Sequence, residues 1–310
     1  MRRLMTAVLV VGVVAASARA DWNPGDGHKM HYPQLPYLST DGMGMDVLDC
    51  PGVEETWYYP NGYDEPPWSM PAIPQTMLAD DWQCTGSGAV TDIHIWGSWN
   101  GDMVPEEWAQ EPAVFRLTIW SNNPSGPGGW SVPGELKWER WFDPGDYQSR
   151  IYARNLFEYF YGPNEGTPDV GLIGSDTVCR QYNFDIPATE AFRQEAGEVY
   201  WLGVEAYYTM RELTIGAWED PPGEWVEYEE VLEWQWGWKT SGVDRFMDGA
   251  VYRDLRWWEG GPQLWSPWTE MRQPFTDQPF DLSFVITPEP ATMALLGLGL
   301  AGLAMRRKKK

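Results

Sequence analysis

Short runs of alternating apolar and polar residues constrain the fold of this chain most strongly. In one of them, Ile93 and Ile95 alternate with Asp92 and His94. Successive side chains of a strand point to opposite faces, so each run predicts a half-buried β-strand. The runs occur at 92–95, 115–119, 181–186, 199–208, 213–218, 233–239 and 282–287.

Turn-forming residues separate these runs. The segment 122–129 holds two asparagines, two prolines and three glycines, which is enough for a long connection. Only 189–196 and 150–161 have a spacing that suggests helix. The pattern therefore predicts an all-β domain, an antiparallel β-sandwich of jelly-roll or lectin-like type with long irregular loops.

The amino end has the form of a secretion signal. Arg2 and Arg3 precede an apolar stretch at 4–16, and Ala18 and Ala20 place small residues on either side of Arg19. These are the three regions of a signal peptide. We predict a signal helix in residues 1–20, cleavage after Ala20 and export by general secretion.

Residues 21–75 differ from the chain that follows. They carry nine prolines between Pro24 and Pro74, many glycines and little periodicity. Such composition predicts irregular structure that runs over the surface. Aromatic residues such as Trp57 and Trp68 are expected to pack this segment against the rest of the domain. The β-sandwich domain is therefore expected at 76–287.

The carboxyl end combines three features within residues 288–310. Pro288, Glu289 and Pro290 precede a 15-residue apolar stretch at 291–305, and five basic residues close the chain at 306–310. As a helix the apolar stretch rises roughly 22 Å, short of the roughly 30 Å hydrocarbon core of a bilayer. A thin membrane helix with its basic end inside is expected.

This tail resembles the PEP-CTERM signal of exported bacterial proteins. The resemblance implies an exosortase-type membrane protease as partner, cleavage near the motif and only transient membrane anchoring. It also implies a cell-surface or extracellular-matrix setting in bacteria that make exopolysaccharide. A permanent single-pass anchor is the alternative interpretation of the same residues.

The body of the chain is similar to a Trp-rich β-domain found on planctomycete-type PEP-CTERM proteins. That resemblance covers roughly 76–287 and implies no assigned activity, so it transfers no site residue. The segments that carry it are 79–82, 96–99, 115–121, 132–136, 200–202 and 236–241.

The exported body is strongly acidic. Of 22 basic residues, three lie in the signal peptide and five in the terminal cluster, leaving 14 against 44 of the 45 acidic residues, a net charge of about −30. Such a surface repels nucleic acid and anionic lipid. Divalent cations and neutral polymers are compatible partners, and solubility alone is the other explanation.

Cysteine and histidine offer little chemistry. Cys50, Cys84 and Cys179 allow one disulfide with a spare thiol, or three unpaired cysteines. If a bridge forms, we expect Cys50 to pair with Cys84 and tie the N-terminal segment to the first strands. With three histidines in the chain, a zinc site is not expected.

The chain contains 21 tryptophans. Trp234, Trp236 and Trp238 alternate along one run, so their rings share a strand face. Such a row either stacks sugar rings or fills the interior of the sandwich, and both alternatives stay open. The candidates for glycan stacking are those in loop-like sequence, namely Trp257, Trp258, Trp265 and Trp268.

Carboxylates form several groups that could ligate calcium through oxygen. We expect no cofactor, although structural calcium is compatible with these groups; the identity of any metal ligand is unknown from the sequence. Solvated acidic loops are the alternative. The groups are Asp80 with Asp81, Asp143 with Asp146, and Asp244 with Asp248 and Asp254.

Catalytic motifs are absent from the sequence. It contains no G-x-S-x-G elbow, phosphate-binding glycine loop or H-E-x-x-H helix. The expected function is therefore that of a non-catalytic, exported protein that interacts with exopolysaccharide or other surface components and not with nucleic acid. A secreted glycan-active hydrolase is the alternative, since chance carboxylate pairs abound in so acidic a chain.

Overall fold

The computed structural model describes residues 21–49, 75–104, 113–126, 128–163, 171–207, 211–218, 225–232, 235–242, 246–256 and 264–287. The predicted signal helix, with Ala18 and Ala20, lies outside these residues, as does the tail with Pro288, Glu289 and Pro290. Within the described part of the chain, no helix is long and apolar enough to cross a membrane.

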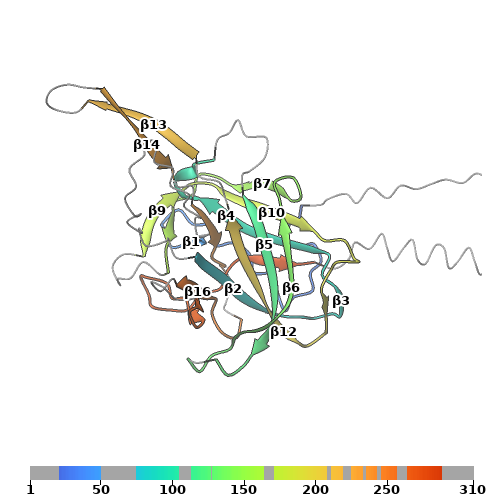
Figure 1. The fold of residues 1–310 in the computed structure, drawn as a ribbon. Coiled ribbons are helices and arrows are strands. Elements are labelled where there is room, and N and C mark those ends of the chain that lie inside the picture. Colours follow the sequence, from blue (N-terminus) through green and yellow to red (C-terminus); the bar gives the residue numbers. More distant parts are fainter. Residues whose placement is uncertain are drawn as a thin grey trace, which may run out of the picture.

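The fold is all-β, as predicted, and is built on two large sheets that pack against one another (Figure 1). The eight-stranded sheet has the order β7 (Gln148–Ala153), β10 (Cys179–Asp185), β4 (Asp92–Trp99), β15 (Trp236–Lys239), β1 (Met45–Asp49), β8 (Glu158–Tyr161) and β9 (Leu172–Asp176), with β19 (Phe284–Ile286) also paired to β4.

The seven-stranded sheet faces it. Its order is β17 (Leu264–Trp265), β16 (Val251–Arg256), β2 (Gln75–Gln83), β12 (Val199–Tyr207), β5 (Val114–Asn123) and β6 (Val132–Phe142), with β18 (Thr269–Glu270) also paired to β16. Among the described strands the pairings are antiparallel except that of β1 with β8.

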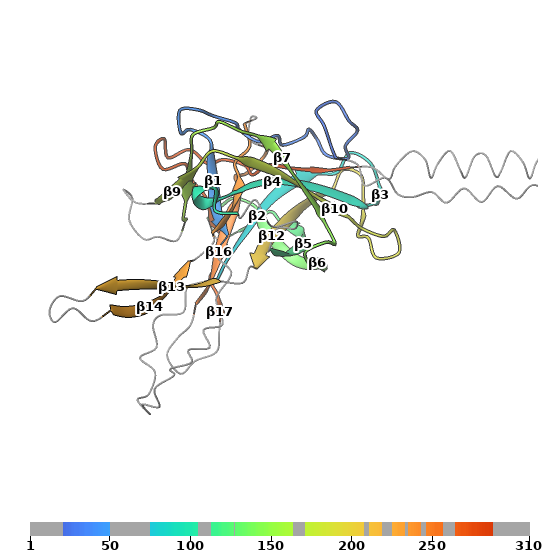
Figure 2. The ribbon, with the colours of Figure 1, turned by 90° about the horizontal axis from the view of Figure 1, so that it is seen from above.

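Smaller elements lie at the margins. A short pair joins β3 (Gly88–Ala89) to β11 (Arg193–Gln194), and a 3₁₀ turn, η1, spans Asn100–Asp102. The strands β13 (Arg211–Trp218) and β14 (Trp225–Leu232) form a hairpin that projects away from the two large sheets (Figure 2).

Aromatic side chains fill the space between the two sheets. Phe115 of β5 contacts the rings of Tyr182, Phe184 and Trp236 on the opposing sheet, with ring centroids 5.1, 5.3 and 5.2 Å apart. Trp236 and Trp238 are both fully buried. The structure therefore places these two tryptophans in the interior and not on a sugar-binding platform; Trp234 lies outside the described residues.

The strand β4 was expected to be half-buried, and that prediction is wrong. His94, on the face opposite Ile93 and Ile95, is only 1% exposed. The reason is that the N-terminal segment covers this face: Trp22 meets the ring of Trp96 edge-on at 6.0 Å.

The same segment contributes a strand that the sequence analysis missed. Residues Met45–Asp49 were expected to be irregular, yet they form β1, which is buried throughout between β15 and β8. Their alternation is hidden because apolar and acidic residues are buried on both faces. Residues 50–74 of the Pro/Gly-rich segment lie outside the described residues.

Both helix predictions are wrong. Residues 150–161 divide between β7 and β8, and Asn155 between them has a φ of +60°, which a right-handed helix does not allow. Residues 189–196 form a turn followed by β11. The strands β7, β8 and β11 pair with β10, β1 and β3, and this pairing outweighs the local helical spacing.

Cys84 is free, so it does not form the bridge to Cys50 that was expected if the chain held a disulfide; Cys50 itself lies outside the described residues. Cys84 is a free, buried thiol that donates a hydrogen bond to the carbonyl oxygen of Gly86 (3.1 Å). Cys179 is also free and buried. Cys84 points into the packed interior, where burial raises the pKa of its thiol and favours the protonated form.

Candidate functional site

The outward face of the seven-stranded sheet gathers aromatic and arginine side chains. In β5, Phe115, Leu117 and Ile119 are buried against the other sheet, so the alternate residues Arg116 and Trp120 lie on the opposite face. The register extends this outward face across the sheet. Its members include Arg253 of β16, Trp201 and Glu205 of β12, Arg116 and Trp120 of β5, and Glu139 and Trp141 of β6.

Arg253 is enclosed by three indole rings. Its guanidinium carbon lies 5.0 Å from the ring centroid of Trp120 and 4.4 Å from those of Trp265 and Trp268. Each such cation–π contact is worth about 0.5–2 kcal/mol, depending on how far the pair is desolvated. Burial lowers the pKa of Arg253 to about 10, so the residue remains cationic at neutral pH.

The tryptophans around Arg253 are half-buried, with part of each side chain accessible. Beneath them Trp201, Ala79 and Val251 form a small buried cluster on which Trp120 and Trp268 pack. The indole nitrogen of Trp120 donates to Oγ1 of Thr118 (2.9 Å). The rings of Trp120 and Trp268 are therefore held by packing and are not free on the surface.

A second charged group continues the same face. Arg116 donates two hydrogen bonds to Glu139, at 2.7 and 3.2 Å, and one to Glu205 at 2.7 Å. The ring of Trp141, which is 49% exposed, lies 5.7 Å from this guanidinium and 5.0 Å from the ring of Tyr207. Burial raises the pKa of Glu205, although Arg116 opposes the shift.

A glycine makes room for this arrangement. Gly203 of β12 lies between Trp201 and Glu205, and a Cβ there would come within 2.3 Å of Thr118 Oγ1 and 3.2 Å of the Trp120 indole nitrogen. Any larger residue would displace the hydrogen bond that orients Trp120. The sequence requirement at position 203 thus follows from the packing of the face.

Two of the predicted glycan-stacking residues are brought together here. Trp265 and Trp268 both lie beside Arg253, whereas Trp257 and Trp258 fall outside the described residues. Sequence reasoning missed Trp120, Trp141 and Arg253. The alternation of Arg116, Thr118 and Trp120 against apolar neighbours was the available signal, since it placed these residues on the outer side of their strand.

The acidic groups proposed as calcium ligands serve as hydrogen-bond acceptors in the structure. Asp80 accepts from the backbone of Leu282 (2.6 Å), and Asp146 accepts from the backbone of Asp143 (3.3 Å) within a turn. Asp248 accepts from the backbone and hydroxyl of Ser131. Asp244 lies outside the described residues.

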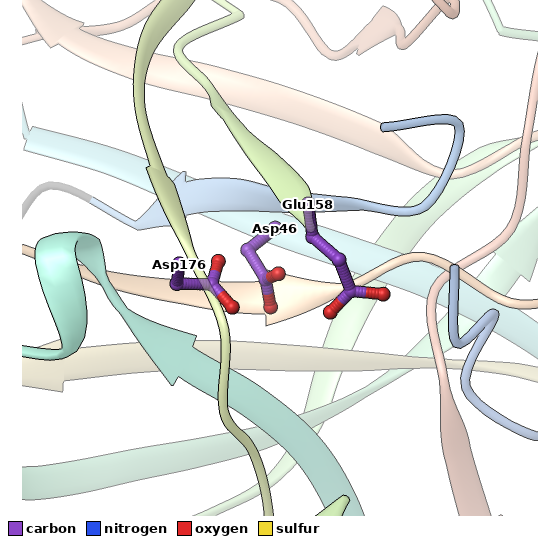
Figure 3. A group of neighbouring side chains, drawn as sticks. All are labelled: Asp46, Glu158 and Asp176. Atoms are coloured by element: carbon purple, nitrogen blue, oxygen red, sulfur yellow. The ribbon is translucent and has the colours of Figure 1, made fainter. Parts of the chain in front are cut away.

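A different group of carboxylates meets on the eight-stranded sheet. Asp46 of β1, Glu158 of β8 and Asp176 of β9 each have a carboxylate oxygen within 4.8 Å of the others, and all three are buried. Figure 3 shows the carboxyl group of Asp176 turned toward that of Asp46, with Glu158 on the other side. We call these residues, with Lys239, the acid–lysine cluster.

Lys239 is the resident cation of this cluster. Its Nζ lies 2.9 Å from Asp46 Oδ2 and 2.5 Å from Glu158 Oε2, and its side chain is fully buried. Burial lowers the pKa of Lys239, but Asp46 and Glu158 outweigh this effect and leave the pKa raised. Burial raises the pKa of Glu158 to about 7 and that of Asp176 to about 10.

No sequence motif predicts the acid–lysine cluster, because its members come from four separate strands. Asp46 and Lys239 face one another across the β1–β15 pairing, and Glu158 faces Asp176 across β8–β9. Both pairs lie on the face of the sheet opposite Trp238. Backbone N–H of Ser39, from the segment that covers this face, donates to Glu158 Oε1 (2.9 Å).

The acid–lysine cluster predicts a pH dependence of stability in calcium-free buffer. The folded state holds the Glu158 proton up to a pH of about 7, whereas the unfolded chain releases it near 4.5. Since the folded state then binds more protons, the free energy of unfolding should fall as pH rises from about 4.5 to about 7. Urea unfolding across this range checks it, and Glu158→Gln should flatten the decline; an unchanged slope in that variant would contradict the assignment.

Comparison with known proteins places the chain in a family. A domain of unknown function, DUF7901, matches residues 30–287, and the PEP-CTERM protein-sorting motif matches residues 287–308. No curated protein and no solved structure matches the chain. The sorting motif implies export and processing by an exosortase, a membrane enzyme. The chain therefore belongs to the DUF7901 family and carries a PEP-CTERM sorting signal at its C-terminus.

Proposed function

We propose that this DUF7901 domain is a non-catalytic polysaccharide-binding domain of the cell surface or extracellular matrix. It contacts exopolysaccharide with the outward face of the seven-stranded sheet. Exosortase processing delivers the domain to this setting, and the sheet face supplies the contact. The final location at the surface or in the matrix is part of the proposal.

The observation that carries the proposal is the set of half-buried indoles around Arg253. Trp120 and Trp268 are held by packing from below, Trp265 contacts Arg253, and all three side chains are only half-buried. An indole combines a flat apolar surface with an N–H donor, which suits a sugar ring that is apolar on its faces and polar at its rim. Fixed aromatic anchors also lose little conformational entropy on binding.

Charge favours an uncharged or cation-bridged polymer as the ligand. The body carries a net charge of about −30, which repels nucleic acid and other polyanions. Arg116 and Arg253 provide local guanidinium donors on this sheet face, and Glu139 and Glu205 provide acceptors. Hydroxyl groups of a polysaccharide can bond to both kinds of group.

One arrangement bears on the hydrolase alternative. Glu139 and Glu205 lie beside Trp141 and Tyr207, and they differ in environment, since the side chain of Glu205 is 5% exposed and that of Glu139 is 48% exposed. Hydrolysis, however, requires a glycosidic bond between the two carboxylates. The guanidinium of Arg116 occupies that position by pairing with both, which favours binding over catalysis.

Polysaccharide binding should be sensitive to the tryptophans of this face. With exopolysaccharide purified from the producing bacterium, the full chain should show a saturable shift in tryptophan emission. Trp141→Ala and Trp268→Ala should each weaken binding about tenfold or more, as expected for loss of an aromatic anchor. Trp141 is the cleaner test because its ring is exposed and its removal should leave stability nearly unchanged.

Phe275→Ala is the matched control, since Phe275 is 51% exposed and contacts Tyr159 of the eight-stranded sheet. It should bind as the wild type does. Equal affinity of the wild type and both tryptophan variants would overturn the proposal. Release of reducing ends by the wild type, abolished in Glu205→Gln, would instead support the hydrolase.

A further inference from the structure

The acid–lysine cluster carries more negative charge than its lysine neutralises. Three carboxylates and one ammonium group leave a formal charge of −2 when all are ionised, and the four side chains are 1% exposed or less. Buried charge without a counter-ion costs several kcal/mol per ion, so such an excess must be compensated. Bound protons or a divalent cation would both provide that compensation.

The excess negative charge of the cluster lies at Asp176, which has no cation beside it in the described part of the chain. Lys239 and the backbone of Ser39 contact Asp46 Oδ2 and both oxygens of Glu158. Among the described residues, no backbone, ammonium, guanidinium or hydroxyl donor contacts either oxygen of Asp176 or Oδ1 of Asp46. Asp176 is 1% exposed and is turned toward Asp46 (Figure 3). The buried carboxyl group of Asp176 therefore faces another carboxyl group, with no cationic or N–H donor beside it among the described residues.

The spacing of the carboxylate oxygens and their chemistry as ligands suit a hard cation. Calcium binds carboxylate oxygens at 2.3–2.6 Å, so two of its ligands are separated by at most about 5 Å. The carboxylate oxygens of this cluster lie within 4.8 Å of one another. Oxygen ligands alone favour calcium or magnesium over zinc or copper. Three paired strands hold the carboxylates in position, so little rearrangement is needed.

We propose that Asp46, Glu158 and Asp176 form a binding site for one calcium ion on the eight-stranded sheet. The ion lies among the three carboxylates, within reach of Asp176 and of Oδ1 of Asp46. It neutralises the charge that Lys239 leaves and links β1, β8 and β9. This site is separate from the calcium groups expected from the sequence and from the aromatic sheet face.

Thermal unfolding of the full chain tests the site. At pH 8, calcium at about 100 times its Kd should raise the unfolding midpoint by about 5–10 °C relative to the protein in EGTA. Equilibrium dialysis against radioactive calcium should show one tightly held ion per chain.

The variant Asp176→Asn should abolish both the shift and the tightly held ion while preserving the shape of the side chain. Asp49→Asn is the matched control, because Asp49 is an equally buried carboxylate of β1 that accepts a hydrogen bond from the backbone of Ala206 (2.5 Å). It should keep the full calcium response.

Two results would overturn the proposal. Persistence of the shift in Asp176→Asn would place calcium elsewhere in the chain. Absence of any calcium response in the wild type, together with a higher midpoint for Asp176→Asn in EGTA, would show that a proton and not a metal ion balances the cluster. If Asp176→Asn fails to fold, dialysis of the wild type decides the matter, because a chain that retains no tightly held calcium has no such site.

Discussion

Lys239→Met is expected to destabilise the protein by about 3–5 kcal/mol, measured by urea unfolding in EGTA at pH 7. The substitution keeps most of the apolar side chain but removes the ammonium group that contacts Asp46 and Glu158. Breaking a buried ion pair on one side leaves a buried charge without a partner, which accounts for the size of the loss.

Lys137→Met is the matched control for that experiment. Lys137 forms an ion pair with Glu135, but the side chains of the two residues are 36% and 75% exposed. An exposed pair contributes less than about 1 kcal/mol. Adding Asp46→Asn to Lys239→Met should recover part of the loss, because it removes one of the unpaired charges. Full stability of Lys239→Met alone would mean that the cluster does not carry the charges assigned to it.

Phe115→Ala should cost about 3–5 kcal/mol, the range for truncation of a fully buried aromatic residue. The ring of Phe115 joins the two sheets through Tyr182, Phe184 and Trp236. Its removal leaves a cavity that rings on both sheets cannot fill without leaving their own rotamers. For a domain of this size the unfolding midpoint should fall by roughly 10 °C.

Phe275→Ala provides the comparison within the same residue type. Its side chain is 51% exposed, so the loss should stay within about 0.5 kcal/mol. Equal effects of the two substitutions would contradict the assignment of Phe115 to the interface between the sheets. The contrast also measures how much stability comes from packing between the sheets.

The two proposed binding sites lie on the outer faces of different sheets. The seven-stranded sheet exposes part of its aromatic residues and is the proposed contact for polysaccharide. The eight-stranded sheet is covered by the N-terminal segment, which buries the acid–lysine cluster and His94. Binding of sugar and binding of calcium are therefore expected to be measurable independently, because they involve different sheets.

For the alternating runs, local sequence determined that the segment becomes a strand and which of its faces is apolar. The runs at 115–119 and 181–186 are found in β5 and β10, and their apolar residues point into the interior. Alternation of side chains is a property of the single strand, so it can be seen without knowing the neighbours. The same rule applied to the run 115–119 puts Arg116 on the face opposite the buried Phe115 and Leu117.

Tertiary structure alone decided what covers each strand and which strands are neighbours. It buried His94 of β4 on its second face, turned 150–161 into two strands, and assembled Asp46, Glu158, Asp176 and Lys239. An alternating pattern contains no information about the register between distant strands or about the segment that packs over them. Contacts between residues far apart in the chain therefore created the acid–lysine cluster and enclosed Arg253. Neither the cluster nor the enclosure of Arg253 can be predicted from a local sequence pattern.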